Sequence, residues 1–232
     1  SFPTRRSSDL LASNNSKKLI ELRELLSDMD IDVISQQEAG CTFQVEETGE
    51  SFEENACLKA KAVTDATGMP AIAEDSGLVV DALGGAPGIY SARFGGESCK
   101  TGADRIGLLL EKMKKAELRS ARFVSCIVCT FPNGDVLRAR GECEGEILTV
   151  PRGENGFGYD PVFRPLGHDK SMAEMSLAEK NSISHRGKSL AEFKKLLSDY
   201  LKNKPAKSDK GGDETSKEKQ DMSLTSKQRA QL

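Results

Sequence analysis

The chain has 232 residues, 37% of them apolar and 30% charged, which is enough for a buried core. Its 33 basic and 36 acidic residues are interspersed and sum to −3, so no broad positive field is available for a nucleic-acid backbone. No apolar run approaches the roughly 18 residues of a membrane span, and the basic start is not followed by the apolar segment of a secretory signal. We therefore expect a cytoplasmic protein that binds neither nucleic acid nor membrane.

The cysteines are scattered, and in a cytoplasmic protein thiols stay reduced. Cys126 and Cys129 are the closest pair, but they lie in an alternating, strand-like segment, where residues three apart point to opposite faces. No second pair completes a zinc site. The prediction is six free thiols, at Cys41, Cys57, Cys99, Cys126, Cys129 and Cys143.

The two ends differ in character from the middle of the chain. Residues 1–9 show no hydrophobic periodicity and stand where an α/β enzyme places its first buried strand, so we interpret them as non-native or atypical. Residues 203–232 consist mainly of charged and small polar residues, a composition that predicts a disordered tail. Residues 10–202 are predicted to form the folded domain.

The first predicted elements alternate between helix and strand. Apolar residues at helical spacing follow the polar segment 13–15 and predict a helix that begins directly after a loop. A short strand is expected at 31–34. Ser51 and Glu54 then form a capping-box pattern before a second helix with one apolar face.

The central part of the sequence predicts β structure. Apolar runs at 71–73 and 78–83 read as two strand segments interrupted by the polar residues 74–77. The segments 121–131 and 135–150 flank a Pro-Asn-Gly turn and should form an antiparallel hairpin.

Further helices are expected around this hairpin. Thr101 with Asp104 and Ser176 with Glu179 have the spacing of capping boxes. A last helix carries Leu190, Phe193 and Leu197 on one side. The order of elements predicts a mixed α/β fold.

Two acidic pairs are candidates for a divalent metal site. Glu46-Glu47 precedes the capped helix, and Glu74-Asp75 lies between apolar strand segments. Oxygen-rich sites with few protein ligands suit Mg²⁺. The alternative for the first pair is an ordinary solvated loop. The second pair would be partly desolvated, and its carboxylates would repel each other unless a positive group lies nearby.

Three segments are candidates for binding a nucleotide. Residues 13–18 offer hydroxyl, amide and ammonium groups at a helix start, which suits phosphate, although such clusters often serve only as caps. The glycine-rich segment 153–160 contains two aromatic residues and a carboxylate, which suits a flat base or, alternatively, a turn with its aromatics in the core. His185 and Arg186 open the last helix, where an ordinary cap is the other reading.

Taken together, the ordered motifs closely resemble the inosine/xanthosine triphosphate pyrophosphatase family over roughly residues 10 to 200. The resemblance implies an elongated α/β fold with a long mixed β-sheet, flanking helices, two lobes around a cleft, and a homodimer. The segments that carry it are 13–18, 46–49, 52–60, 73–78, 83–93, 157–161 and 179–186.

This resemblance also implies roles for individual residues. Asp75 would activate water and bind Mg²⁺, with Glu46 or Glu74 as further metal ligands. The substrate would be contacted by Ser13, Asn14, Asn15, Ser16, Lys17, Lys18, Ser76, Phe157, Gly158, Tyr159, Asp160, Lys180, His185 and Arg186. The family places a β-strand directly before residue 13, and this sequence is expected to depart from that pattern.

The resemblance implies hydrolysis of ITP, dITP and XTP to a monophosphate and pyrophosphate, which removes these purine nucleotides from the nucleotide pool. Asp75 would take a proton from, or orient, the attacking water, while Lys18 and Lys180 offset the charge of the leaving group. Two alternatives remain open: a pyrophosphatase with a different base preference, and a nucleotide-binding protein without catalysis.

Overall fold

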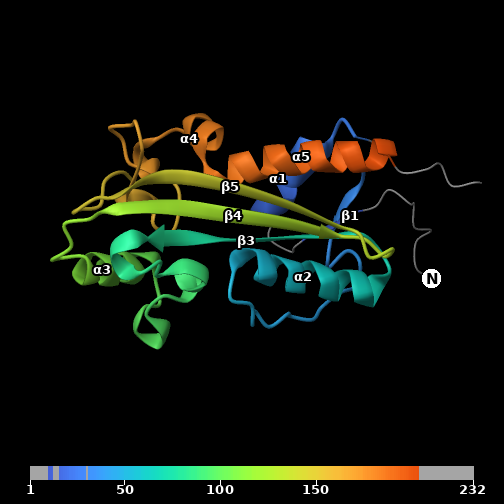
Figure 1. The fold of residues 1–232 in the computed structure, drawn as a ribbon, viewed down its shortest axis with the longest axis horizontal. Coiled ribbons are helices and arrows are strands. Elements are labelled where there is room, and N and C mark those ends of the chain that lie inside the picture. Colours follow the sequence, from blue (N-terminus) through green and yellow to red (C-terminus); the bar gives the residue numbers. More distant parts are fainter. Residues whose placement is uncertain (1–9, 13–15, 30, 204–232) are drawn as a thin grey trace, which may run out of the picture. The chain divides into compact units, whose positions relative to one another are not determined.

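A computed structural model describes residues 10–12, 16–29 and 31–203 of the chain. Six strands form one mixed sheet in the order β2-β1-β3-β4-β5-β6 (Figure 1). The pairs β2–β1 and β1–β3 are parallel, whereas β3–β4, β4–β5 and β5–β6 are antiparallel. The strands are β1 (Leu10–Ala12), β2 (Val33–Ser35), β3 (Ala71–Val80), β4 (Ser120–Thr130), β5 (Val136–Ile147) and β6 (Phe163–Pro165). The predicted mixed α/β fold is confirmed.

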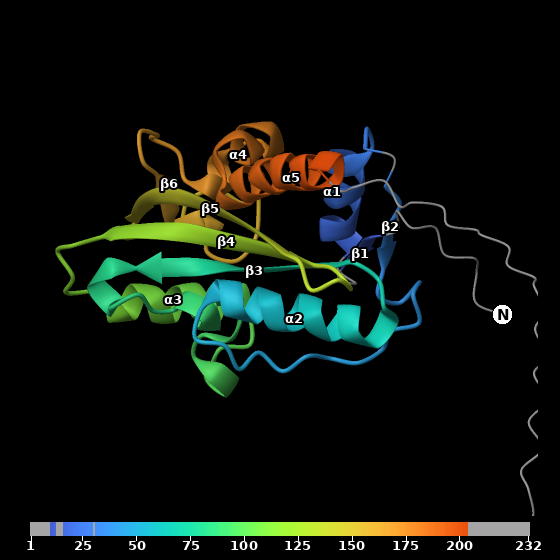
Figure 2. The ribbon, with the colours of Figure 1, turned by 45° about the vertical axis from the view of Figure 1, so that its right-hand side comes forward.

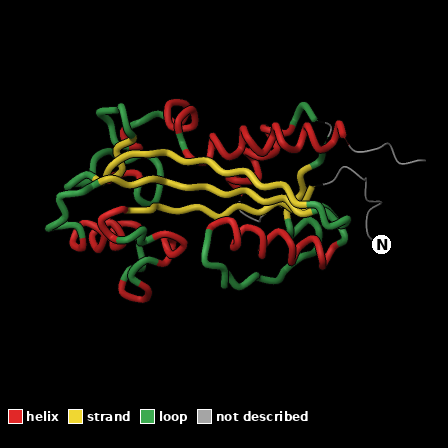
Figure 3. Tube along the Cα trace, viewed as in Figure 1, coloured by secondary structure: helices red, strands yellow, loops and turns green. Residues whose placement is uncertain are grey.

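The long strands β3, β4 and β5 lie side by side and form the centre of the sheet (Figure 3). The turn between β4 and β5 is the predicted one: Thr130 pairs with Val136, and the Gly134 amide donates to the Phe131 carbonyl over 2.9 Å. Its glycine has a φ of 90°, a left-handed conformation that other residues rarely adopt. The hairpin prediction is confirmed.

Both faces of the sheet are covered by helices: α1 (Ser16–Leu26), α2 (Phe52–Thr67), α3 (Gly102–Lys112), α4 (Leu177–Ile183) and α5 (His185–Asn203). The leucines of α1 pack with Ile72 and with Phe193 of α5. The alanines of α2 pack against Ala73 and Val128. Because Ile72 and Ala73 are consecutive on β3, their side chains lie on opposite faces. Figure 2 accordingly shows α5 and α2 on opposite sides of the sheet.

The predicted caps are present with one difference. Thr101 with Asp104 and Ser176 with Glu179 form complete capping boxes. Ser51 accepts from the Glu54 amide, but the Glu54 carboxylate turns to the amide of the preceding residue, Glu50, over 2.7 Å. The helix start is therefore correctly predicted, but the Glu54 carboxylate accepts the amide of Glu50 instead of that of Ser51.

Two predictions about strands are wrong. The polar residues 74–77 do not interrupt the strand: β3 runs without a break from Ala71 to Val80, and each of its residues pairs with one on β4. A strand does precede the phosphate-loop segment, since β1 ends at Ala12 and pairs with both β2 and β3. In both places backbone pairing with a neighbour determines the structure, and such pairing cannot be read from local composition.

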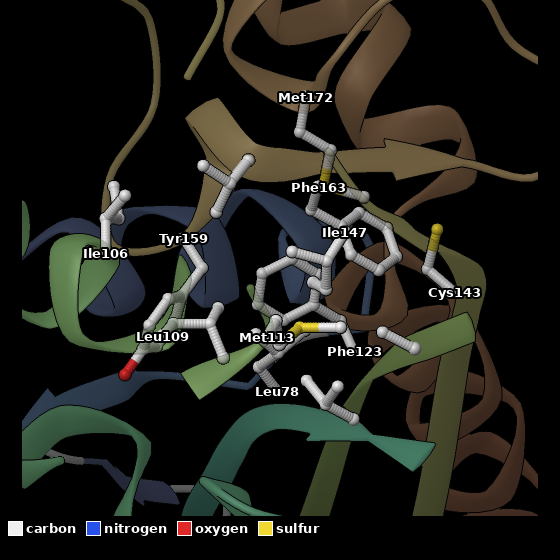
Figure 4. Packing of buried hydrophobic residues seen from close by; sticks show 13 residues of the cluster. Leu78, Ile106, Leu109, Met113, Phe123, Cys143, Ile147, Tyr159, Phe163 and Met172 are labelled. Atoms are coloured by element: carbon white, nitrogen blue, oxygen red, sulfur yellow. The ribbon is translucent and has the colours of Figure 1, made fainter. Parts of the chain in front are cut away.

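The two largest hydrophobic clusters of the described residues lie toward opposite ends of the long strands. One cluster joins α1 and α5 to Ile72, Ile127 and Cys129. The other surrounds Leu78 and Phe123 and includes residues of α3 and the loop before β6 (Figure 4). Along β3 the polar residues 74–76 lie between these two clusters, and on the α2 face Phe52 packs with Val124 and Cys126 of β4.

The six cysteines are free, as predicted. Five are buried, and only Cys57 is half-exposed. Among the described residues, no helix is long and apolar enough to span a bilayer. The interpretation of residues 1–9 and of the tail from 204 onward falls outside the part of the chain that the structure describes.

Candidate active site

The middle of β3 has an open edge. On that side β3 pairs with β1 at Ala71, and an isolated bridge joins Val79 to Pro87. Between these points no described strand pairs with β3, but Ser91 accepts the Leu78 amide over 2.8 Å, so the unpaired part of the edge ends before Leu78. The ion pair between Lys18 and Glu74 places the beginning of α1 beside this segment. A ligand at this edge could reach side chains from both faces of the sheet, and the amides of the first turn of α1 favour an anion.

Glu74 and Asp75 lie on opposite faces of β3, because successive side chains on a strand alternate. Glu74 contacts Lys18 of α1 and Arg186 of α5. Asp75 contacts Lys59 of α2. The repulsion expected between the adjacent carboxylates is thereby avoided, and each has its own cation. The two sets of contacts flank the open edge of β3.

On the α2 face, one lysine links two carboxylates. The Lys59 Nζ lies 3.0 Å from both Asp75 Oδ1 and Glu47 Oε1. Arg93 holds the other oxygen of Glu47 at 2.8 Å. Burial raises the pKa of Asp75, and the nearby Glu47 charge raises it further, while Lys59 opposes both. Burial would also raise the pKa of Glu47, but its hydrogen bonds to Arg93 and Lys59 hold it below the usual range.

One oxygen of Asp75 has no well-aligned hydrogen bond among the described residues, although the nearby Asn55 side chain counteracts the rise in the pKa of this carboxyl group. Its Oδ2 atom is buried without a hydrogen bond, whereas Oδ1 is bound by Lys59. An unpartnered buried acceptor of this kind requires an explanation, such as a bound cation. No group of three or more His, Cys, Asp or Glu residues in the described part of the chain forms a ready-made metal cluster. Any cation here would therefore keep ligands from solvent or substrate.

Lys59 and Arg93 were not among the predicted site residues, and Glu47 rather than Glu46 makes the contacts on this face. Glu46 is exposed. A signal for Lys59 was present in the sequence, because it is seven residues after Phe52 and therefore lies on the apolar stripe of α2. A lysine in such a stripe suggests a buried partner.

On the other face, Glu74 is bound by two cations. Its Oε2 atom lies 3.3 Å from the Lys18 Nζ and 3.1 Å from the Arg186 Nε, the latter an ion pair without hydrogen-bond alignment. Ser125 on β4 donates to Oε1 over 3.4 Å. Although burial works the other way, the two cations lower the pKa of Glu74. A small cavity of about 30 Å³ lies here, between α1, β3 and α5.

His185 begins α5 and is buried beside this cluster. Its ring stacks on Phe123 with 4.9 Å between centroids, and its Nδ1 has no hydrogen-bond partner among the described residues. Burial lowers its pKa to about 4, and the positive charges of Lys180, Arg186 and Lys18 act in the same direction. The imidazole is therefore neutral at pH 7 and can offer either a donor or an acceptor.

The glycine-rich segment contributes one exposed aromatic ring. Phe157 is 74% exposed, and the Lys180 ammonium lies 4.6 Å from its ring centroid. The same ammonium is 2.5 Å from the buried Asp160 carboxylate, which also accepts the Phe157 amide. Tyr159 instead packs in the core and donates its hydroxyl to the Ser91 carbonyl over 3.0 Å. Only one of the two aromatics is therefore available to a flat ligand.

The remaining predicted residues are placed as follows. Ser76 is half-buried in β3, opposite Ser125 of β4, and Gly158 is exposed in the turn before β6. Ser16 and Lys17 are in the first turn of α1. Ser13, Asn14 and Asn15 fall outside the described residues. The structure thus brings together Lys18, Glu74, His185 and Arg186 on one face of β3, with Asp75 on the other.

The sequence and the fold of this chain are shared with known proteins. The chain matches the Ham1 family over residues 10–196 and belongs to that family. Relatives include the dITP/XTP pyrophosphatase of Desulfotalea psychrophila, 45% identical with 86% of this chain and 93% of the relative covered. That of Deinococcus radiodurans is 48% identical over 78% and 88% of the two chains.

Solved structures agree with this assignment. A HAM1 protein from Coxiella burnetii is 44% identical and superimposes with a TM-score of 0.78, covering 82% of this chain and 98% of that one. The Staphylococcus aureus Ham1 protein gives 0.79 at 40% identity, with 83% and 99% covered.

Proposed function

We propose that this chain hydrolyses dITP, ITP and XTP to the nucleoside monophosphate and pyrophosphate. The names of its relatives, at 44–48% identity over most of both chains, support this substrate class. The observation in the fold that carries the proposal is the open edge of β3, where a partly buried carboxylate faces one side and a group of cations faces the other. Hydrolysis of a triphosphate needs both: a base for water and positive charge for phosphate oxygens.

The metal in this proposal is Mg²⁺. The Asp75 Oδ2 atom, which has no well-aligned hydrogen bond, fits a cation. Glu46 would supply a second carboxylate oxygen. It lies next to Glu47, which Lys59 links to Asp75. When bound, Mg²⁺ would neutralise charge on the phosphate oxygens. The residues that would hold it come from β3 and from the loop that precedes α2.

The side chains themselves account for the remaining steps. Asp75 accepts a proton from, or orients, the water that attacks the α-phosphorus. Lys18 and Lys180 offset the charge of the departing pyrophosphate. The roles of Ser13 to Lys17 in holding phosphate remain part of the proposal.

Base recognition is assigned to the glycine-rich segment and to the start of α5. Phe157 offers an exposed ring face for stacking. The neutral His185 and the adjacent Arg186 supply donors for the O6 atom that the bases hypoxanthine and xanthine share. A site built to hydrogen-bond O6 can reject adenine by about 10⁴, because the amino group there leaves buried donors unpaired.

The test is an assay of released pyrophosphate, separate from orthophosphate, with ITP, dITP, XTP, GTP and ATP and with Mg²⁺ present or chelated. We expect pyrophosphate from the first three, little from GTP or ATP, and none without a divalent cation. A pyrimidine and a methylated nucleoside triphosphate are assayed in the same way, and equal turnover of either would show that the proposed base preference is wrong. Binding without release of pyrophosphate would favour a non-catalytic nucleotide-binding protein.

The proposal also includes a homodimer and a cytoplasmic location. The location comes from the composition of the sequence. The homodimer comes from the resemblance to the family and is tested by light scattering coupled to size exclusion at several protein concentrations. A mass of one chain throughout, about 25 kDa, would contradict the dimer.

A further inference from the structure

Glu74 is a buried carboxylate whose contacts are not those of a metal ligand. Its side chain is 10% exposed, and its Oε2 atom is shared by Lys18 and Arg186, residues 168 apart in the sequence. Its Oε1 atom accepts the Ser125 hydroxyl. Both oxygens are thus used, and two positive charges lie within 3.3 Å, which disfavours a divalent cation there by direct repulsion.

We propose that Glu74 is a positioning residue that holds Lys18 and Arg186 in place for the phosphates and the base, rather than a ligand of the metal; this inference rests on the proposed function of the site. Without a carboxylate between them, the two side chains would repel each other, and their long flexible stems would adopt many rotamers. The carboxylate fixes both in one arrangement before substrate binds, which reduces the ordering cost at the binding step.

A pair of serines connects this carboxylate to α5. Ser125 and Ser189 are both fully buried, with 2.9 Å between their hydroxyl oxygens. Because Ser125 donates to Glu74, the single hydroxyl hydrogen of Ser189 goes either to the Ser125 oxygen or to the Arg186 carbonyl, which lies 3.1 Å away. When Ser189 donates to Ser125, the two hydroxyls link the Glu74 carboxylate on β3 through β4 to α5, the helix that carries Arg186.

The second ion pair of Arg186 shows why Glu74 is the decisive partner. Arg186 Nη1 lies 2.7 Å from Glu21 Oε2, but the Glu21 side chain is 38% exposed, so that pair is screened by water. Glu74 pairs with both Lys18 and Arg186, whereas the described ion pair of Glu21 is with Arg186. Glu21 therefore serves as a matched control.

The charge of Glu74 has opposite effects on affinity and on turnover. A carboxylate between the two cations weakens their attraction for a polyphosphate anion, while it orients them for the transition state. Glu74→Gln keeps the size of the side chain and removes the charge. We expect the variant to bind inorganic tripolyphosphate several-fold more tightly and to turn over ITP at least ten-fold more slowly. A residue that serves only as structural support would not tighten anion binding.

The experiment compares wild type, Glu74→Gln and Glu21→Gln, each checked for native unfolding by circular dichroism. Tripolyphosphate binding is measured by calorimetry, and kcat, KM and the half-saturating Mg²⁺ concentration are measured with ITP. The expected result is tighter tripolyphosphate binding, reduced kcat and an unchanged Mg²⁺ requirement for Glu74→Gln, with Glu21→Gln within about two-fold of wild type, as for an exposed ion pair.

Three results would overturn the inference. A ten-fold higher Mg²⁺ requirement with kcat restored at high Mg²⁺ would make Glu74 a metal ligand. Unchanged or weaker tripolyphosphate binding, or an equal effect of Glu21→Gln, would remove its special role. If Glu74→Gln does not fold, Ser125→Ala is measured instead, and wild-type behaviour of that variant would count against the proposal. An inactive wild type would refute the proposed function, while the calorimetry would still test Glu74.

Discussion

Lys59 is the main group that favours the charged form of Asp75. Burial and the neighbouring Glu47 both raise the pKa of this carboxyl group, and the Lys59 ammonium at 3.0 Å opposes them. Such a balance is typical of a group that must be anionic yet basic enough to accept a proton near neutral pH.

Asp75→Asn preserves the shape of the side chain and removes the anion. We expect kcat for ITP to fall by about 10²–10⁴, the usual contribution of a general base, while the unfolding transition stays cooperative. The measurement is pyrophosphate release under saturating substrate. Retention of full activity would exclude Asp75 as the base.

His185 predicts a pH dependence of stability. Its pKa is about 4 in the folded chain, below the roughly 6.5 of an unfolded histidine. Between these values the unfolded state binds the extra proton, so the contribution of neutral His185 is present above pH 6.5 and is lost as the pH falls toward 4.

The comparison is between wild type and His185→Gln in urea denaturation at pH 7 and pH 5. The stability advantage of wild type should shrink by about 2 kcal/mol at the lower pH, because only wild type gains a proton at this position on unfolding. A constant difference between the two proteins would show that His185 titrates normally in the fold.

At the scale of elements, the start of α5 is positioned by a glycine on β5. Gly141 pairs with Ser125, and a Cβ atom at this position would collide with the His185 carbonyl oxygen and the Ser189 backbone nitrogen. The backbone of α5 therefore approaches β5 more closely than any side chain permits. This contact sets where His185 and Arg186 lie relative to β3.

Gly141→Ala should destabilise the fold by about 1–3 kcal/mol and raise KM for ITP, because α5 must shift away from the sheet. The control is Gly107→Ala in α3, where an added Cβ meets nothing within 4 Å and removal of a helical glycine stabilises by about 0.5–1 kcal/mol. Thermal unfolding and steady-state kinetics measure both. Equal behaviour of the two variants would exclude the close-packing explanation.

At the scale of the whole molecule, the packed sheet protects most thiols from reaction. Burial raises the pKa of Cys126 and Cys143, and it raises that of Cys129 to about 12. Since the thiolate is the reactive form, these groups should be inert in the folded chain.

A thiol-reactive disulfide reagent at pH 8 should therefore modify Cys57 rapidly and the five buried cysteines only after denaturation. The readout is the number of thiols that react before and after addition of guanidinium. Rapid reaction of three or more in the native protein would show that the interior opens far more readily than its packing indicates.

The sequence alone determined the mixed α/β class, the central hairpin, the helix starts and the segments that carry the family resemblance. These follow from local physics: helical periodicity, caps of Ser or Thr three residues before an acid, and a Pro-Asn-Gly turn. The same local physics misread β3 as interrupted and β1 as absent, because hydrogen bonds to neighbouring strands can hold a polar or very short segment in a sheet.

Only the tertiary structure decided how the site is divided. Adjacent positions in the sequence suggested that Glu74 and Asp75 act as a pair, but the two-residue period of a strand sends them to opposite faces, each with its own cations. Lys59, Arg93 and Ser125 entered the site through contacts between distant segments. Composition and spacing fix which residue types are available, whereas strand register and helix packing determine which of them meet.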